Sequence, residues 1–175
     1  GEMFLYERAM PGQPAEKKRY LYAVGPDAED YLIQYALDVW VYTAVSELAS
    51  DFASAPLEVW HRGRPQKAEA HGILELLGAF GKPSDDEDLF EFLERHASNF
   101  LLTGQSYWYW HTSRGGAPEA VYHLPVEAMF VAPGASEVVS HYVMRWMGEE
   151  YNLPKENVTH FRKFHPFSRY HGLGP

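Results

Sequence analysis

The spacing of apolar residues changes partway along this chain, and that change limits what it can fold into. Up to Gly104 the apolar residues recur at the three- and four-residue spacing of amphipathic helices. After Gly104 they fall in short alternating runs separated by turn residues, as in strands joined by hairpins. Helices followed by hairpin-connected strands indicate an α+β domain, with two or three helices packed on an antiparallel sheet.

Three helices are predicted in the first part of the chain. One covers about residues 28–54, and a short one follows around residues 73–80. The third carries its apolar face as far as Gly104. Its start is predicted from Ser84 and Glu87, which have the spacing of a capping box.

An acidic run at residues 85–88 precedes the third helix. It has the carboxylate oxygens that hard cations prefer. Consecutive residues point in different directions, however, and negative charge at a helix N-terminus stabilises the helix dipole. The run is therefore interpreted as part of a helix cap and not as a metal site.

Short alternating runs predict the strands. An early strand is expected at residues 57–61, before a turn at residues 62–65. The five later strands are predicted at residues 106–112, 120–124, 128–132, 141–148 and 157–164. A hairpin turn containing Gly115 and Gly116 joins the first two of these.

Residues 1–26 differ from the rest, because they contain several prolines and glycines and show no sustained period. They are predicted to form an arm or linker with one short edge strand near residues 20–24. The domain itself is predicted to cover residues 27–175.

Composition excludes several classes of protein. Cysteine is absent, which removes disulfides and thiolate metal sites. No apolar run approaches the roughly 20 residues needed to cross a bilayer, so the chain is predicted to be soluble and to have no membrane partner. The net charge of −9 argues against a general nucleic-acid-binding surface. Common nucleotide, zinc-protease and serine-hydrolase motifs are missing, so no catalytic residue, metal ligand or cofactor is predicted.

A basic and aromatic segment near the end of the chain has several interpretations. Its histidines suggest a metal site, but their spacing does not match a compact ligand pair. The favoured interpretation is an edge strand whose Phe161 and Phe164 pack inward, followed by an irregular loop. The residues predicted to contact phosphate, if any here do, are Arg162, Lys163 and Arg169.

A second aromatic cluster lies in the strand that starts after Gly104. Strand alternation sends two rings of the run Tyr107-Trp108-Tyr109-Trp110 to each face of the sheet. A core contact on one side and an interface on the other explain this cluster better than a stacking platform for bases. Trp108 and Trp110 are predicted to contact a neighbouring subunit.

Four short segments occur in one order along the chain. They are Pro56-Leu57-Glu58-Val59-Trp60, Gly104-Gln105-Ser106-Tyr107, Val158-Thr159-His160-Phe161 and Gly172-Leu173-Gly174-Pro175. Together they resemble segments of the portal, or head-tail connector, proteins of tailed double-stranded DNA bacteriophages. Gly174 departs from that family, which usually has serine there.

The resemblance implies that residues 27–175 form a wing-like α+β domain, cut before the long helices of the stem and clip. It implies a structural subunit and not an enzyme. That subunit would belong to a homo-oligomeric ring of about twelve copies at one capsid vertex of the virion, assembled in the host cytoplasm. Double-stranded DNA would pass through the ring during packaging and ejection, and capsid, tail-adaptor and terminase proteins would be its partners.

Two other functions remain open from the sequence. One is a metal-dependent phosphodiesterase that uses His160, His165 and His171. The other is a monomeric interaction domain that grips a partner through the aromatic strand containing Trp108.

Overall fold

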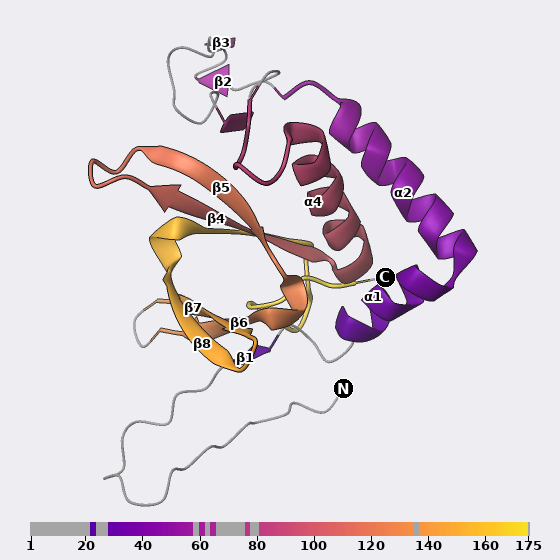
Figure 1. Ribbon diagram of the computed structural model, residues 1–175. Coiled ribbons are helices and arrows are strands. Elements are labelled where there is room, and N and C mark those ends of the chain that lie inside the picture. Colours follow the sequence, from indigo (N-terminus) through magenta and orange to yellow (C-terminus); the bar gives the residue numbers. More distant parts are fainter. Residues whose placement is uncertain are drawn as a thin grey trace, which may run out of the picture.

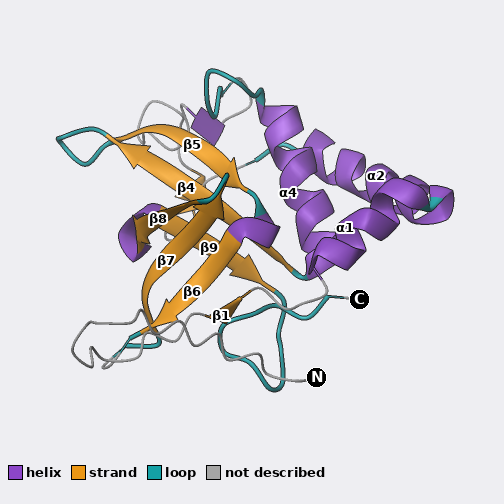
Figure 2. Ribbon diagram, turned by 60° about the horizontal axis from the view of Figure 1, so that its bottom comes forward, coloured by secondary structure: helices purple, strands orange, loops and turns teal. Residues whose placement is uncertain are grey.

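Helices pack against one side of a group of antiparallel sheets in the computed structural model of the chain (Figure 1). The structure describes residues 22–23, 28–57, 60–61, 64–65, 76–77, 81–134 and 137–174. Helix α4 (Leu89–Thr103) lies between α2 (Val39–Ser54) and strand β4 (Gln105–Thr112) (Figures 1 and 2). The arrangement confirms the predicted α+β class.

The helix predicted at residues 28–54 is wrong in one respect, because it is two helices. Helix α1 (Ala28–Leu37) ends at Leu37, because the extended backbone of Asp38 (φ −102°, ψ 114°) interrupts the helix. The Asp38 carboxylate accepts hydrogen bonds from the backbone N–H groups of Trp40 (2.8 Å) and Val41 (3.3 Å). Asp38 is therefore the N-cap of α2. The predicted end before Pro56 is confirmed, since α2 stops at Ser54.

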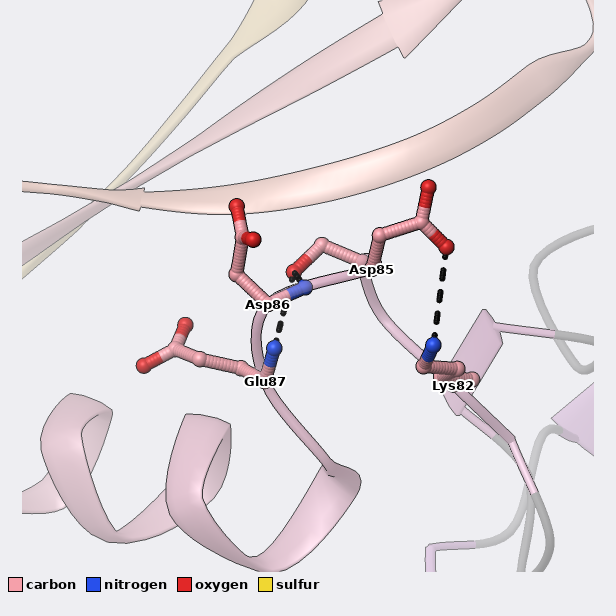
Figure 3. Close-up of polar contacts among 5 residues, drawn as sticks. Lys82, Asp85, Asp86 and Glu87 are labelled. Carbon is pink, nitrogen blue, oxygen red and sulfur yellow. Dashed lines mark hydrogen bonds and ion pairs between the residues drawn. The ribbon is translucent and has the colours of Figure 1, made fainter.

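Helix α4 begins later than the capping-box prediction placed it. Its N-cap is Asp88, whose carboxylate accepts from the backbone N–H of Glu91 at 2.9 Å. The Ser84 hydroxyl instead accepts from the N–H groups of Asp86 (3.4 Å) and Glu87 (3.3 Å), within the bend before the helix (Figure 3). Asp88 directly precedes the first residue of α4. It is therefore closer than Ser84 to the unpaired backbone N–H groups of the first turn, and it takes the capping role.

The short helix predicted at residues 73–80 falls almost entirely outside the described residues, although Leu76 and Leu77 are helical. Within the part of the chain that the structure describes, no helix is long and apolar enough to span a membrane.

The strands of the described residues form three antiparallel sheets. A three-stranded sheet has the order β5-β4-β9, with β5 at Pro118–Leu124 and β9 at Val158–Arg162. A four-stranded sheet has the order β1-β6-β7-β8. Its members are Tyr22–Ala23 (β1), Met129–Pro133 (β6), Val139–Trp146 (β7) and Glu149–Pro154 (β8). A small third sheet pairs Trp60–His61 (β2) with Arg64–Pro65 (β3).

The five predicted later strands are confirmed as β4, β5, β6, β7 and β9, and β1 confirms the predicted edge strand. Strand β8 was not predicted. Its residues are almost all exposed, so they lack the alternating apolar pattern that marks a strand. The predicted strand at residues 141–148 overran β7 into a turn, in which Met147 and Gly148 have positive φ (51° and 83°). Within the strand predicted at residues 57–61, Trp60 and His61 form β2, and residues 58–59 lie outside the described part.

Strand β4 separates two apolar cores. Tyr107 packs into the core between the sheets, with Val126, Met129 and Val131. Trp108 packs into the core beneath α4, where its ring centroid lies 4.9 Å from that of Phe92. Tyr109 and Trp110 flank the same two cores, so the predicted alternation of the four rings is confirmed.

Two short 3-10 helices, Val126–Ala128 (η2) and Lys155–Asn157 (η3), connect strands of different sheets.

Candidate functional site

Three glycines meet where the C-terminal segment crosses the end of α4, and we call Gly104, Gly172 and Gly174 the glycine junction. Gly104 has φ 74°, a left-handed conformation that suits glycine at a helix end. A Cβ atom on Gly172 would lie 1.9 Å from the carbonyl oxygen of Gly104, and one on Gly104 would lie 2.2 Å from that of Leu173. The backbones therefore touch at a distance that no other residue type permits.

The glycine junction brings together segments that are far apart in the sequence. The N–H of Lys163, at the end of β9, donates to the carbonyl oxygen of Gly104 at 2.8 Å. A Cβ atom on Gly174 would lie 3.1 Å from the ring of Tyr31 in α1. Figures 1 and 2 show the C-terminus beside α1. Three of the four segments that resemble the portal family thus converge at this place.

Gln105 fills the space beside the junction and is 1% exposed. Its side-chain Oε1 accepts hydrogen bonds from the Tyr107 hydroxyl (3.3 Å), His160 Nε2 (3.2 Å) and the Gly172 N–H (3.4 Å). An amide oxygen only accepts, so His160 carries its proton on Nε2. Burial, together with the nearby charges of Arg162 and His171, lowers the pKa of His160 to about 3. The cluster is therefore neutral, and its bonds join β4, β9 and the C-terminal segment.

Burial also keeps the Tyr107 hydroxyl protonated. The low polarity around it raises the pKa of Tyr107 well above its usual value. The ring of Tyr107 stacks on that of His160 with centroids 4.1 Å apart.

A second buried polar chain joins α4 to the three-stranded sheet. Ser106 Oγ lies 2.9 Å from His96 Nδ1 and 2.9 Å from His123 Nε2, and Trp108 Nε1 lies 3.1 Å from the same His96 nitrogen. An indole N–H only donates, so His96 Nδ1 must be unprotonated and must also accept from the Ser106 hydroxyl. Ser106 in turn accepts from Nε2–H of His123. Each hydrogen bond that joins His123, Ser106, His96 and Trp108 therefore has one possible direction of donation.

Both histidines of this polar chain are held neutral. Burial lowers the pKa of His96 to about 4. Burial, with a smaller effect of His96 and Arg95, lowers the pKa of His123 to about 3. A proton on His96 Nδ1 would face the N–H of Trp108, so the geometry and the lowered pKa agree.

The serine between two imidazoles has the pairing of an activated nucleophile, but it is not placed for catalysis. Ser106 is 0% exposed, so a substrate does not reach its hydroxyl. His123 also borders an open groove of about 540 Å³ between α4, η2 and β7. Arg95 lines the same groove, and its guanidinium is paired with Glu87 at 2.7 Å. Two polar groups of the groove, Arg95 and His123, are therefore engaged within the fold.

Two histidines of the phosphodiesterase alternative, His160 and His165, have separate roles. His160 donates to Gln105, whereas His165 Nδ1 accepts from the backbone N–H groups of Phe167 (3.1 Å) and Ser168 (2.9 Å). Among the described residues, no group of three or more histidines and carboxylates is placed to hold a metal ion.

The carboxylates of the acidic run before α4 also have separate partners. Asp85 pairs with Lys82 at 3.5 Å, Glu87 pairs with Arg95, and Asp88 caps the helix. Figure 3 shows the carboxylates of Asp85, Asp86 and Glu87 pointing apart.

The residues predicted to contact phosphate lie at the end of β9 and in the loop after it. Arg162 and Arg169 are exposed, and the Lys163 ammonium lies 5.6 Å from the centre of the Phe100 ring. The inward packing predicted for Phe164 is wrong, because its side chain is 85% exposed, whereas Phe161 does pack under α4. Strand β9 ends at Arg162, so Phe164 lies in the loop beyond the sheet, where strand alternation no longer places its side chain.

The two tryptophans predicted to contact a neighbour lie on the helix side of β4. Trp108 is buried, and Trp110 is half-buried with its indole N–H donating to Thr159 Oγ1 at 2.8 Å. Their contact with another subunit stays a prediction.

The buried polar clusters around Gln105 and Ser106, together with the glycine junction, hold the helices and strands of this domain to one another. The family described as Phage portal protein matches residues 39–175. The chain therefore belongs to the phage portal protein family, which confirms the resemblance seen in its short segments. No curated protein matches the chain.

Solved structures share the fold. One is a chain in the neck of an empty gene transfer agent (GTA) particle computed with C6 symmetry, which is 20% identical with a TM-score of 0.76. The match covers 87% of this chain and 40% of that one. Another is in the neck of the native particle computed with C12 symmetry, at 19% identity and a TM-score of 0.73, covering 89% of this chain and 40% of that one. A third is in the virion of the native particle, at 19% identity and a TM-score of 0.72, covering 87% and 40%. The chain thus spans about two fifths of the length of these chains.

Proposed function

We propose that this chain is the wing-like part of a portal subunit, a structural component of a ring at the capsid vertex of a virion. The observation that carries the proposal is the family match over residues 39–175. The neck and virion particles that contain similar folds support it, since two of them were computed with C6 or C12 symmetry. The domain of residues 27–175, after an N-terminal arm, would form the outer part of each subunit.

The role we propose is mechanical and not catalytic. Double-stranded DNA would pass through the ring while the genome is packaged and ejected, and capsid, tail-adaptor and terminase proteins would contact the ring, which would assemble in the host cytoplasm. The buried position of Ser106 supports a role without hydrolysis, because the serine lies out of reach of substrate. Arg162, Lys163 and Arg169 remain predicted phosphate contacts.

Native mass spectrometry of the complete gene product tests this function. We expect a closed assembly of about twelve copies, because a heterologous contact that closes generates a ring. A product that stays monomeric at every protein concentration would contradict the proposal, and partner binding through the aromatic strand would then be the leading function.

A further inference from the structure

An apolar row is exposed along α2. Trp40, Ala44, Leu48 and Phe52 are spaced four residues apart and so form one row on the helix, which we call the α2 stripe. Trp40 is 82% exposed, Leu48 57% and Phe52 46%. A neighbouring face of α2 packs toward the domain through the buried residues Ala49 and Ala53. In Figure 2, α2 lies on the side of the helices away from the sheets.

Such a row does not suit a surface that stays in water. Exposed apolar side chains that gather in one patch usually mark a contact with another molecule. Glu47 and Asp51, both exposed, lie three residues after Ala44 and Leu48 and therefore border the α2 stripe with negative charge. The partner of the stripe should thus combine apolar anchors with positive charge.

The loop after β9 has this combination, and we call residues 163–171 the aromatic loop. Phe164 is 85% exposed and Phe167 is 94% exposed. The exposed cations Arg162 and Arg169 lie just before and within the loop. Aromatic residues, phenylalanine among them, and arginine are enriched at protein–protein interfaces.

The aromatic loop is shaped by its own hydrogen bonds. His165 Nδ1 accepts from two backbone N–H groups, as described above, and Ser168 Oγ accepts from those of Tyr170 (3.1 Å) and His171 (3.2 Å). Two successive side-chain-closed turns therefore hold Phe167 outward. A loop that is already ordered loses less conformational entropy when it binds.

We propose that the aromatic loop of one subunit packs on the α2 stripe of the next copy of this chain. Phe164 and Phe167 would lie against Leu48 and its row, with the arginines opposite the carboxylates that border the row. This inference rests on the proposed function, because a ring needs two different surfaces on each subunit that fit one another. Contact with phosphate alone would leave both phenylalanines in water, so a second copy fits the loop better than DNA.

Disulfide cross-linking tests the pairing in a chain that has no cysteine of its own. The complete protein carrying Leu48→Cys and Phe164→Cys is oxidised after assembly and run on a non-reducing gel. We expect a ladder of covalent oligomers that ends at the size of the ring, because each copy would be linked to the next. The matched control carries Leu48→Cys with Tyr122→Cys, an exposed apolar position on β5, and should give no ladder.

A second measurement separates the interface from the fold and from the function. Phe167→Ala should raise the protein concentration needed for half-assembly at least about tenfold, since truncating an interface anchor typically costs that much or more. Arg162→Glu with Arg169→Glu should also weaken assembly, and Glu47→Arg with Asp51→Arg in the same chain should restore part of it.

The outcomes decide between the inference and the proposed function. Rings that form but give no ladder from the Leu48 and Phe164 cysteines would overturn this pairing and leave the portal function intact. Failure of the unmodified complete protein to form rings would overturn both. Unchanged assembly of the arginine variant, with loss of affinity for a double-stranded DNA oligonucleotide, would assign the aromatic loop to phosphate instead.

Discussion

Acid should destabilise this domain through its buried histidines. The pKa of His96 is lowered to about 4 and that of His123 to about 3, chiefly because burial disfavours the charged imidazole. An imidazole in the unfolded chain titrates near pH 6.5. Below that pH the unfolded state binds protons that the folded state does not. The contribution of these histidines to the free energy of unfolding is therefore fully present above about pH 6.5, and it falls as the pH decreases toward about 4 for His96 and about 3 for His123.

The magnitude follows from these pKa values. Going from about pH 6.5 to 5 costs about 2 kcal/mol for each histidine that stays neutral in the fold, and so about 4 kcal/mol for His96 and His123 together. His160 and His171, whose pKa values are lowered to about 3 and about 4, act in the same direction. A domain of this size is stable by about 5–15 kcal/mol, so the loss is a large fraction of the total.

Urea unfolding followed by tryptophan fluorescence measures the effect at pH 7.5 and 5.0. His96→Asn keeps an acceptor near the position of Nδ1 for Trp108 and Ser106 but does not titrate, so the difference between the two pH values should shrink by about 2 kcal/mol. His111→Asn replaces an exposed histidine and is the control that should leave the difference unchanged. A free energy of unfolding that stays constant within about 1 kcal/mol between the two pH values would refute the reasoning.

The remaining predictions concern backbone crossings and caps. Gly172→Ala places a methyl group 1.9 Å from the Gly104 carbonyl oxygen and should cost at least about 3 kcal/mol in urea unfolding, whereas Gly115→Ala, whose Cβ would meet its nearest neighbour at 3.8 Å, should be nearly neutral. Equal effects of the two would contradict the close approach. Asp88→Ala should cost about 1 kcal/mol through loss of the α4 cap, and Ser84→Ala should cost less because it closes only a bend. A larger loss of stability for Ser84→Ala than for Asp88→Ala would instead identify Ser84 as the cap, as the sequence predicted.

Periodic burial explains why much of the fold was predictable. Helix α4 and strands β4 to β7 each bury one side, so their apolar residues carry the period of the element. The break between α1 and α2 was missed because Asp38 sits inside a continuous apolar pattern, and only its capping bonds distinguish it. Strand β8 was missed because it pairs through its backbone and leaves its side chains in water.

The site was predictable only in its pieces. The segments around Gly104, His160 and Gly172 carried the family resemblance, but their meeting at one place depends on how β9 pairs with β4. Nothing local marks Gln105 or His96 as buried partners, since a polar residue after a helix or on its face is usually exposed. Their roles arise from tertiary burial, which brings single acceptors to face several donors.

The contact between the backbones of Gly104 and Gly172 also determines how force travels. The two backbone segments touch without side chains between them, and closely packed interiors compress little. The C-terminal segment therefore cannot slide or tilt without displacing the end of α4. We therefore expect the segment up to Gly174 to move together with α4 and not to bend at this contact. A pull or twist applied there is delivered directly to α4 and to Tyr31 of α1, so the helical layer should turn with the segment as one body.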